Sequence, residues 1–227
     1  LNSIESNFIF DENPINRLKD TTSNLRKEND VDGIDKEKEL NKLKLQINSI
    51  IDCDLKNNSK KIVLGDGNIN SPIMLVGEAP GTEEDVTGLT FLGEVGDLLK
   101  KMLNAINIKK ENIYSTYAVN FRPPEDRKPS PKEIKRYSQF LQKQISIIKP
   151  KLIILMGSTA MESLTGLNSK ISMERGKWKE VIVQNTTYNT IITFNPSYLL
   201  RAPENKKYSW EDLKKIKQKI IDLKLKI

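Results

Sequence analysis

Apolar residues are concentrated in four short runs along the chain, at residues 73–79, 113–119, 151–157 and 189–195. The stretches between them, at residues 93–106, 130–148 and 158–166, carry apolar residues at helical spacing. Apolar strands that alternate with helices are typical of a parallel sheet covered by helices on both faces. The pattern therefore predicts an α/β fold, a three-layer α/β/α sandwich with a central, mainly parallel four-stranded sheet.

The segments that flank this core follow different patterns. Residues 1–35 are polar and mixed in charge, and we expect them to form an N-terminal extension to one domain of residues 36–227. Residues 36–52 predict an amphipathic helix that packs on this domain. Its apolar side chains are Leu40, Leu43, Leu45, Ile47, Ile50 and Ile51. A basic amphipathic helix is predicted at residues 210–227, and a further edge segment of the sheet near Ile62.

The most unusual loop follows the first apolar run, in the stretch "MLVGEAPGTEED" at residues 74–85. Loops rich in glycine, proline, asparagine or arginine also follow the other three runs. Ligands bind at the carboxyl ends of the strands in parallel α/β sheets. Since all four loops lie at that end, the sequence predicts one site with these residues nearby: Glu78, Phe121, Arg122, Asn195, Ser197 and Arg201.

Two absences narrow the chemistry. The chain has no histidine, which excludes Ser-His-Asp and Cys-His catalysis and histidine-ligated metals. Its one cysteine, Cys53, cannot form an internal disulfide, a four-cysteine zinc site or an iron–sulfur cluster. A lone cysteine fits a reducing, cytoplasmic compartment. The glycine-rich phosphate loops of nucleotide-binding proteins are missing as well.

The charge of the chain points to anionic partners. The formal net charge is +7, which favours nucleic acid first. A lysine-rich composition of the kind that AT-rich genomes produce would give the same charge, so charge alone leaves the partner open. No apolar run is long enough to span a membrane and no signal-peptide pattern is present, so we expect no membrane association.

Four segments resemble the motifs of one family, the family-4 uracil-DNA glycosylases. They are "GEAPGTEEDVTGLTFLGEVGDLL", "FRPPEDRKP", "RGKW" and "NPSYLLRAPENKKYSWEDL". The resemblance runs in order and at matching spacing from about Cys53 to Leu223, and residues 1–50 lie outside it. It implies the uracil-DNA glycosylase fold and a monofunctional enzyme that flips a base out of DNA and hydrolyses its N-glycosidic bond.

The resemblance also implies roles for individual residues. Glu78 would orient water or support the cationic sugar of the transition state, and Asn195 is the second catalytic candidate. Phe91 would stack on the flipped base. The base-binding candidates are Gly77, Ala79, Phe91 and Tyr117. The DNA-binding candidates are Arg122, Ser197, Leu199 and Arg201, with Leu199 and Leu200 filling the gap that the base leaves. Without the resemblance, Phe91 and Leu199 would read as core residues and Arg201 as a surface charge.

The sequence departs from the family pattern in three places. Cys53 aligns with the first of four cluster cysteines, but the other three positions hold Lys56, Phe121 and Tyr137, so we expect no iron–sulfur cluster and no cofactor. Tyr117 stands where the family has an asparagine that reads the base, and would crowd the pocket or read another base. Asn195 stands where the family has a histidine that donates to the departing base.

These departures leave three functions open. The first is excision of uracil, the default base of the family. The second is excision of a modified base, such as modified cytosine in phage DNA, in antiviral defence. The third is DNA binding without catalysis, against which the retained Glu78 speaks. In each case we expect DNA as the partner, no membrane, a monomer and a cytoplasmic location.

Overall fold

The computed structural model describes the backbone of residues 21–227 and the side chains of residues 35–227. Contacts divide the chain into two units, Leu1–Asp35 and Lys36–Ile227, and the second is described below. The predicted polar extension at residues 1–35 lies outside the residues whose side chains are described, apart from Asp35. Within residues 21–227, no helix is both long enough and apolar enough to cross a membrane.

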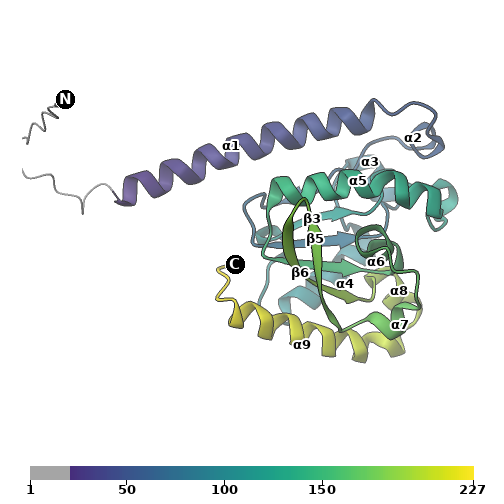
Figure 1. Ribbon diagram of the computed structural model, residues 1–227. Helices are drawn as coiled ribbons and strands as arrows, with labels where there is room; N and C mark the ends of the chain where they lie inside the picture. Colours follow the sequence, from purple (N-terminus) through teal and green to yellow (C-terminus); the bar gives the residue numbers. More distant parts are fainter. Residues whose placement is uncertain (1–20) are drawn as a thin grey trace, which may run out of the picture. The chain divides into compact units, whose positions relative to one another are not determined.

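A six-stranded sheet of order β1-β3-β2-β4-β6-β5 forms the centre of the domain (Figure 1). Its four inner strands are parallel: β2 (Ile73–Gly77), β3 (Tyr114–Tyr117), β4 (Leu152–Met156) and β6 (Thr186–Thr193). The edge strands β1 (Asp66–Gly67) and β5 (Trp178–Val183) run antiparallel to their neighbours. The four predicted parallel strands are thus confirmed, and the predicted edge segment near Ile62 corresponds to β1.

The predicted number of four strands was wrong. The prediction located strands by continuous apolar runs, and β5 has no such run. β5 is half exposed and alternates in burial, so it has no continuous apolar run. It pairs with β6 through a tight turn at Gln184 and Asn185, whose φ angles are 46° and 65°. Positive φ at both central residues is the rule in two-residue hairpin turns, and asparagine tolerates it well. The dipeptide Gln184-Asn185 was the available signal.

Nine α-helices surround the sheet or connect its strands within residues 21–227. They are α1 (Thr21–Asn48), α2 (Asp54–Asn58), α3 (Thr82–Thr87), α4 (Gly93–Asn104), α5 (Pro131–Ile148), α6 (Ser158–Thr165), α7 (Ile171–Glu174), α8 (Pro196–Arg201) and α9 (Lys206–Asp222). Short 3₁₀ turns lie at Lys110–Asn112, Pro124–Asp126 and Pro203–Asn205. The predicted helices correspond to α1, α4, α5, α6 and α9, although α1 and α9 begin earlier than predicted.

The face of α1 differs in part from its prediction. Leu40, Leu43 and Ile47 are buried, whereas Leu45 is 69% exposed; Ile51, which is 81% exposed, lies beyond the end of α1 at Asn48. Spacings of three and four residues place the first three side chains on one side of the helix, and Leu45 falls on the other. The apolar pattern therefore overstated the width of the buried stripe.

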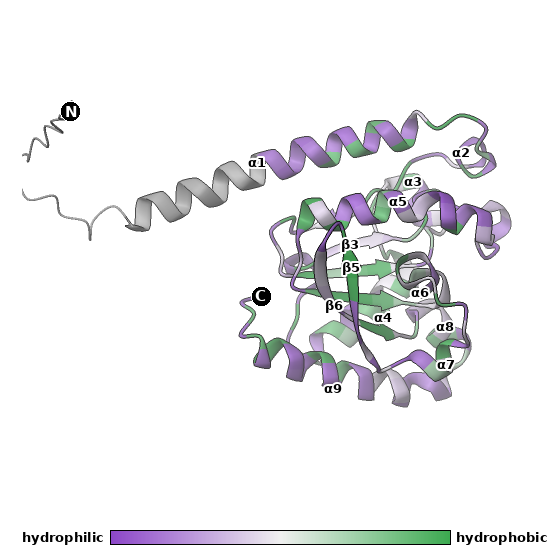
Figure 2. Ribbon diagram, viewed as in Figure 1, coloured by the Kyte–Doolittle hydropathy of each residue, from purple (hydrophilic) through white to green (hydrophobic). Residues whose placement is uncertain are grey.

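Two hydrophobic cores lie on opposite faces of the sheet and make the domain a three-layer sandwich. On β2, Met74 and Val76 point into one core, which contains side chains of α1, α5 and α6. Ile73 and Leu75 point into the other, which contains side chains of α4, α8 and α9. Figure 2 shows hydrophobic strands at the centre of the sheet, a pale and weakly polar β3, and helices of mixed polarity around them. The predicted architecture is therefore confirmed.

A buried ion pair joins α9 to the segment after α7. Arg175 Nε donates to Asp212 Oδ2 over 2.9 Å, and the Thr193 hydroxyl donates to the same oxygen over 2.8 Å. Asp212 is fully buried. Burial raises the pKa of Asp212, and the bonds from Arg175 and Thr193 counteract that rise. Since Arg175 also lies against the Phe194 ring at 5.7 Å, the pair fixes the end of β6.

Replacing Asp212 with alanine leaves the Arg175 guanidinium largely buried without its carboxylate. We expect the free energy of unfolding to fall by about 3–5 kcal/mol, the usual cost of breaking a buried pair. Urea denaturation at neutral pH measures it. Glu211→Ala is the matched control, because Glu211 forms an exposed pair with Lys214 and should cost less than about 1 kcal/mol. Equal losses in the two variants would contradict a structural role for the buried pair.

Candidate functional site

The carboxyl ends of the four parallel strands surround one cavity of about 460 Å³. This volume lies in the range of small-molecule sites, about 300–1,000 Å³. The cavity is lined by most of the site residues that the sequence predicted: Glu78, Ala79, Phe91, Tyr117, Asn195, Ser197 and Arg201. Loops that follow all four parallel strands therefore meet at this cavity. Gly77, Phe121, Arg122 and Leu199 do not line the cavity, and Phe121 belongs to the hydrophobic core.

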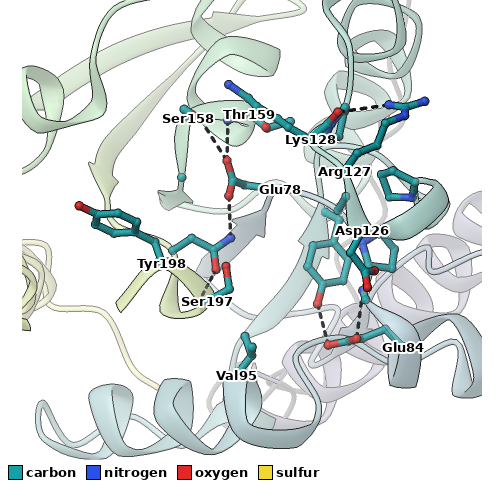
Figure 3. Close-up of a pocket in the computed structure, with 18 of the residues that line it drawn as sticks. Glu78, Glu84, Val95, Asp126, Arg127, Lys128, Ser158, Thr159, Ser197 and Tyr198 are labelled. Carbon is teal, nitrogen blue, oxygen red and sulfur yellow. Dashed lines mark hydrogen bonds between the residues drawn. The ribbon is translucent and has the colours of Figure 1, made fainter. Parts of the chain in front are cut away.

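Glu78 follows β2 directly and meets the first turn of α6 (Figure 3). Its Oε1 accepts the Thr159 N–H over 2.9 Å and the Ser158 hydroxyl over 3.3 Å. The free N–H groups and the dipole of a helix N-terminus stabilise a negative charge. The carboxylate of Glu78 is thus held in one orientation at the cavity wall.

Gly157 makes this arrangement possible. It caps α6 with a φ of 104°, and a Cβ there would lie 2.4 Å from Cδ of Glu78. Any other residue would combine an unfavourable backbone conformation with a collision. The glycine after β4 thus brings the helix N-terminus up against the carboxylate.

Asn195 holds the other oxygen of Glu78. Its Nδ2 donates to Glu78 Oε2 over 3.2 Å, and its Oδ1 accepts the Ser197 N–H over 3.0 Å as the N-cap of α8. Asn195 is buried, and these two bonds occupy both ends of its amide with protein groups. The geometry connects Asn195 to Glu78 and to the start of α8.

An aromatic wall forms another side of the cavity. The rings of Phe91 and Tyr117 pack with centroids 4.9 Å apart. A Cβ at Gly77 would lie 2.7 Å from both rings. Gly77 therefore contributes by leaving room for the aromatic pair, and Ala79 lines the cavity itself.

The Tyr117 hydroxyl points into the protein and is bonded there. It accepts the Phe91 N–H over 2.9 Å and lies 3.3 Å from Oε1 of Glu84. Burial, together with the negative charge of Glu84, raises the pKa of Tyr117 well above its usual value. Tyr117 therefore stays neutral. The sequence prediction missed Glu84, although "GTEED" offered it as one of three neighbouring carboxylates.

The predicted DNA-binding residues divide into two groups. Ser197 and the exposed Arg201 lie at the cavity. Arg122 lies outside it and forms a two-bond pair with Asp126, at 2.7 and 2.9 Å. Leu199 is 1% exposed and belongs to the core.

The prediction that Leu199 fills the gap left by the base therefore needs correction, because α8 turns this side chain inward. Leu200, its neighbour, is 37% exposed. Lys128 and Tyr198 are among the cavity residues that the sequence prediction did not name. Lys128 stands in the quoted "FRPPEDRKP" and could have been found there; Tyr198 stands in "NPSYLLR".

The four positions that align with cluster cysteines are filled by bonded or packed side chains. Cys53 Sγ lies 3.3 Å from the Tyr137 hydroxyl, and the Phe121 and Tyr137 rings meet edge to face at 6.2 Å. Lys56 donates to the Ile50 carbonyl over 3.2 Å. One thiol, two rings and an ammonium cannot ligate an iron–sulfur cluster. Among residues 35–227, no group of cysteine and acidic side chains has the arrangement to hold a metal ion.

The chain is similar in sequence to several known proteins. A type-4 uracil-DNA glycosylase of Thermotoga maritima is 38% identical over 168 residues, which cover 73% of this chain and 86% of the relative. The type-4 uracil-DNA glycosylase of Archaeoglobus fulgidus is 34% identical over 175 residues, covering 75% and 88%. A DNA polymerase of Bacillus phage SP01 is 30% identical over 160 residues, which are 70% of this chain but 17% of the polymerase.

The family comparison agrees with these relatives and with the fold. The sequence model of the uracil DNA glycosylase superfamily matches residues 64–216, which include every inner strand and the cavity loops. The chain therefore belongs to the uracil DNA glycosylase superfamily.

Proposed function

We propose that this protein is a monofunctional DNA glycosylase that flips uracil out of DNA and hydrolyses its N-glycosidic bond to leave an abasic site. One observation carries the proposal: a carboxylate held by three donors faces a cavity that has an aromatic wall. Proteins that act on a base within DNA hold the flipped base in such a pocket, often against an aromatic ring. The relatives named type-4 uracil-DNA glycosylases favour uracil as the base.

Glu78 is the proposed catalytic residue. Cleavage of the N-glycosidic bond builds positive charge on the sugar and negative charge on the departing base. A fixed carboxylate can stabilise that positive charge and orient the water that attacks the sugar carbon. Because Asn195 donates to Glu78, we assign it a positioning role toward this carboxylate.

The shape of the cavity is the main feature that would select a base. Phe91 and the ring of Tyr117 offer the aromatic wall on which a planar base stacks. Gly77 leaves room for these two rings, and Ala79 lines the cavity beside them. A pocket of this kind takes a small flat base better than a bulky one.

The DNA backbone would lie across the rim of the cavity. Arg201 and Lys128 supply positive charge there, and Ser197 a hydroxyl for phosphate oxygens. We assign gap filling to the exposed Leu200 in place of Leu199, and Arg122 to a phosphate contact farther from the cavity. The net charge of +7 supports association with DNA.

The remaining parts of the proposal concern the state of the enzyme. We propose that it works as a cytoplasmic monomer without an iron–sulfur cluster. Neither a modified base nor binding without catalysis is favoured by a specific feature of the cavity.

Glu78→Gln tests the catalytic assignment, because the amide keeps the size of the side chain and removes its charge. We expect single-turnover release of uracil from an oligonucleotide to fall at least about 100-fold, read as alkali-labile sites, with DNA affinity unchanged. Glu180→Gln, on the exposed face of β5, is the control and should be as active as the wild type.

Loss of affinity instead of turnover would make Glu78 a structural residue. The same assay with hypoxanthine, hydroxymethylated cytosine and glucosylated cytosine tests the choice of base. If the wild type releases only a modified base, uracil is the wrong substrate; if it binds DNA and releases nothing, it is a binder.

Salt dependence tests the backbone contacts. We expect the DNA affinity of the wild type to fall steeply with salt, and the slope of log Kd against log salt to decrease by about 1 in Arg201→Gln. Fluorescence anisotropy measures both. Lys151→Gln is the control, because Lys151 lies at the opposite, amino-terminal end of β4 and should leave the slope unchanged. Equal slopes in the wild type and both variants would mean that Arg201 does not contact the DNA backbone.

The absence of a cluster is tested by composition and by stability. We expect protein purified without oxygen to contain no stoichiometric iron or acid-labile sulfide. Tyr137→Ala should lower the free energy of unfolding by about 3–5 kcal/mol, the usual loss on truncating a buried aromatic ring, while Cys53→Ser should cost less than about 1.5 kcal/mol. Iron at about four atoms per chain would overturn this part of the proposal.

A further inference from the structure

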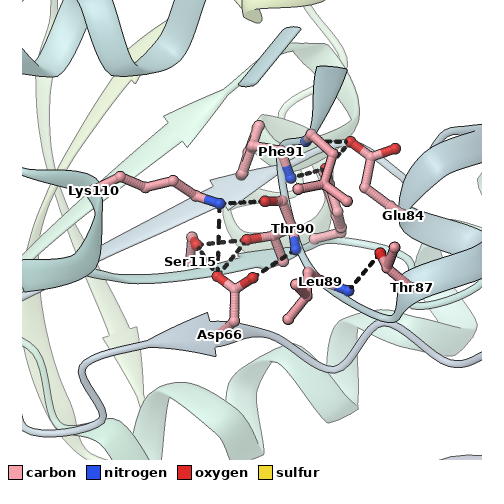
Figure 4. Close-up of polar contacts among 10 residues, drawn as sticks. Asp66, Glu84, Thr87, Leu89, Thr90, Phe91, Lys110 and Ser115 are labelled. Carbon is pink, nitrogen blue, oxygen red and sulfur yellow. Dashed lines mark hydrogen bonds and ion pairs between the residues drawn. The ribbon is translucent and has the colours of Figure 1, made fainter. Parts of the chain in front are cut away.

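The loop that presents Phe91 to the cavity is bound through its backbone by buried and partly buried side chains (Figure 4). Thr90 is one of the loop residues whose backbone is bound. Its N–H donates to Asp66 Oδ2 over 2.7 Å, and its hydroxyl donates to Asp66 Oδ1 over 2.7 Å. Its carbonyl accepts a bond from Lys110. Ser115 joins the group by donating to Asp66 over 2.9 Å.

The backbone N–H groups of the next two residues, Phe91 and Leu92, are also bound by side chains. The Phe91 N–H donates to the Tyr117 hydroxyl over 2.9 Å, and the Leu92 N–H donates to Glu84 Oε1 over 2.9 Å. The second oxygen of Glu84 accepts the Gly81 N–H over 3.1 Å. Three successive N–H groups are therefore bound by three different side chains.

The backbone of Phe91 needs this support. Its φ is 52°, a left-handed conformation that is unfavourable for a residue with a large side chain. Such strain persists only where surrounding contacts hold it. The loop is also pressed against α4, where a Cβ at Gly96 would lie 1.9 Å from the Phe91 carbonyl oxygen.

The hydroxyl of Tyr117 has no hydrogen left to donate to a base. A phenol has one hydroxyl hydrogen to donate, and here the acceptor within reach is Glu84 Oε1 at 3.3 Å. The acceptor side of the hydroxyl takes the Phe91 N–H. Tyr117 is 4% exposed, and the collision that any Cβ at Gly77 would make shows how little room its ring has to turn.

We propose that Tyr117 is a positioning residue whose hydroxyl, supported by Glu84, fixes Phe91 against the flipped base and does not read the edge of that base. This inference rests on the proposed function and refines it. Discrimination between bases then comes from the shape of the cavity and from groups other than the Tyr117 hydroxyl. Its removal should slow the release of every base by the same factor.

Tyr117→Phe tests the proposal, because it keeps the ring and removes the hydroxyl. We expect single-turnover release of uracil and of 5-fluorouracil to fall by the same factor, about five- to tenfold, as for the loss of one hydrogen bond. Affinity for DNA that carries an abasic site should not change. Tyr114→Phe is the matched control on the same strand, because its hydroxyl accepts from Gln144 in the core at 2.7 Å, and its rates should equal the wild type.

The two bases distinguish positioning from reading. Fluorine at C5 changes the hydrogen-bonding strength of the neighbouring carbonyl and N–H of the base. A ratio of the two rates that differs from the wild type by more than about threefold would mean that the hydroxyl reads the base. Unchanged rates for both bases would mean that the hydroxyl does not position Phe91. A wild type that releases neither base would instead refute the proposed function.

Amide hydrogen exchange tests the positioning without any reaction. In the wild type the Phe91 amide should exchange slowly, and in Tyr117→Phe at least about tenfold faster, since it loses its acceptor. Tyr114→Phe should leave it unchanged. Glu84→Gln should also accelerate exchange of the Phe91 amide. In the double variant of Tyr117→Phe and Glu84→Gln, the increase in exchange rate should be smaller than the product of the two single increases, because both residues act in one network. A Phe91 amide equally protected in all variants would overturn the proposal.

Discussion

The hydrogen bonds between the Glu78 carboxylate and the first turn of α6 determine the geometry of the site. They can form only because β2 and β4 are adjacent and parallel, so that the end of one strand meets the helix that follows the other. Asn195 extends this arrangement to β6, the next strand. The carboxylate thus connects three neighbouring strands at their carboxyl ends, and Gly157 provides the space.

The carboxylates that follow β2 have different tasks, which explains why so many occur together. Both Glu78 and Glu84 line the cavity, but the two oxygens of the buried Glu84 accept the backbone N–H groups of Gly81 and Leu92. Asp85 accepts the Lys60 N–H over 2.9 Å and so attaches α3 to the segment before β1. The glycine-rich turn therefore places one carboxylate for chemistry and uses the next ones to hold the loop that surrounds it.

The sequence predicted the parts of this structure that repeat with a simple period. Continuous apolar runs located the four inner strands, and glycine and proline after them located the site. It could not show which side chain of a motif faces outward, and so Leu199 was assigned a role that fits Leu200 better. The partners of Tyr117 were also beyond it, because Phe91 and Glu84 approach from other elements only after the chain has folded. Half-exposed β5 lacked the periodic signal altogether.

The positions that align with cluster cysteines and the aromatic wall of the cavity belong to different hydrophobic cores. Cys53, Phe121 and Tyr137 belong to the core shared with α1 and α5. Phe91, Tyr117 and Leu199 belong to the core on the opposite face of the sheet. A change of volume or polarity in one core is felt by its close-packed neighbours first, and here the sheet lies between the two sets. The packing around Cys53 and Tyr137 can therefore differ on one face of the sheet without moving the aromatic wall of the cavity on the other.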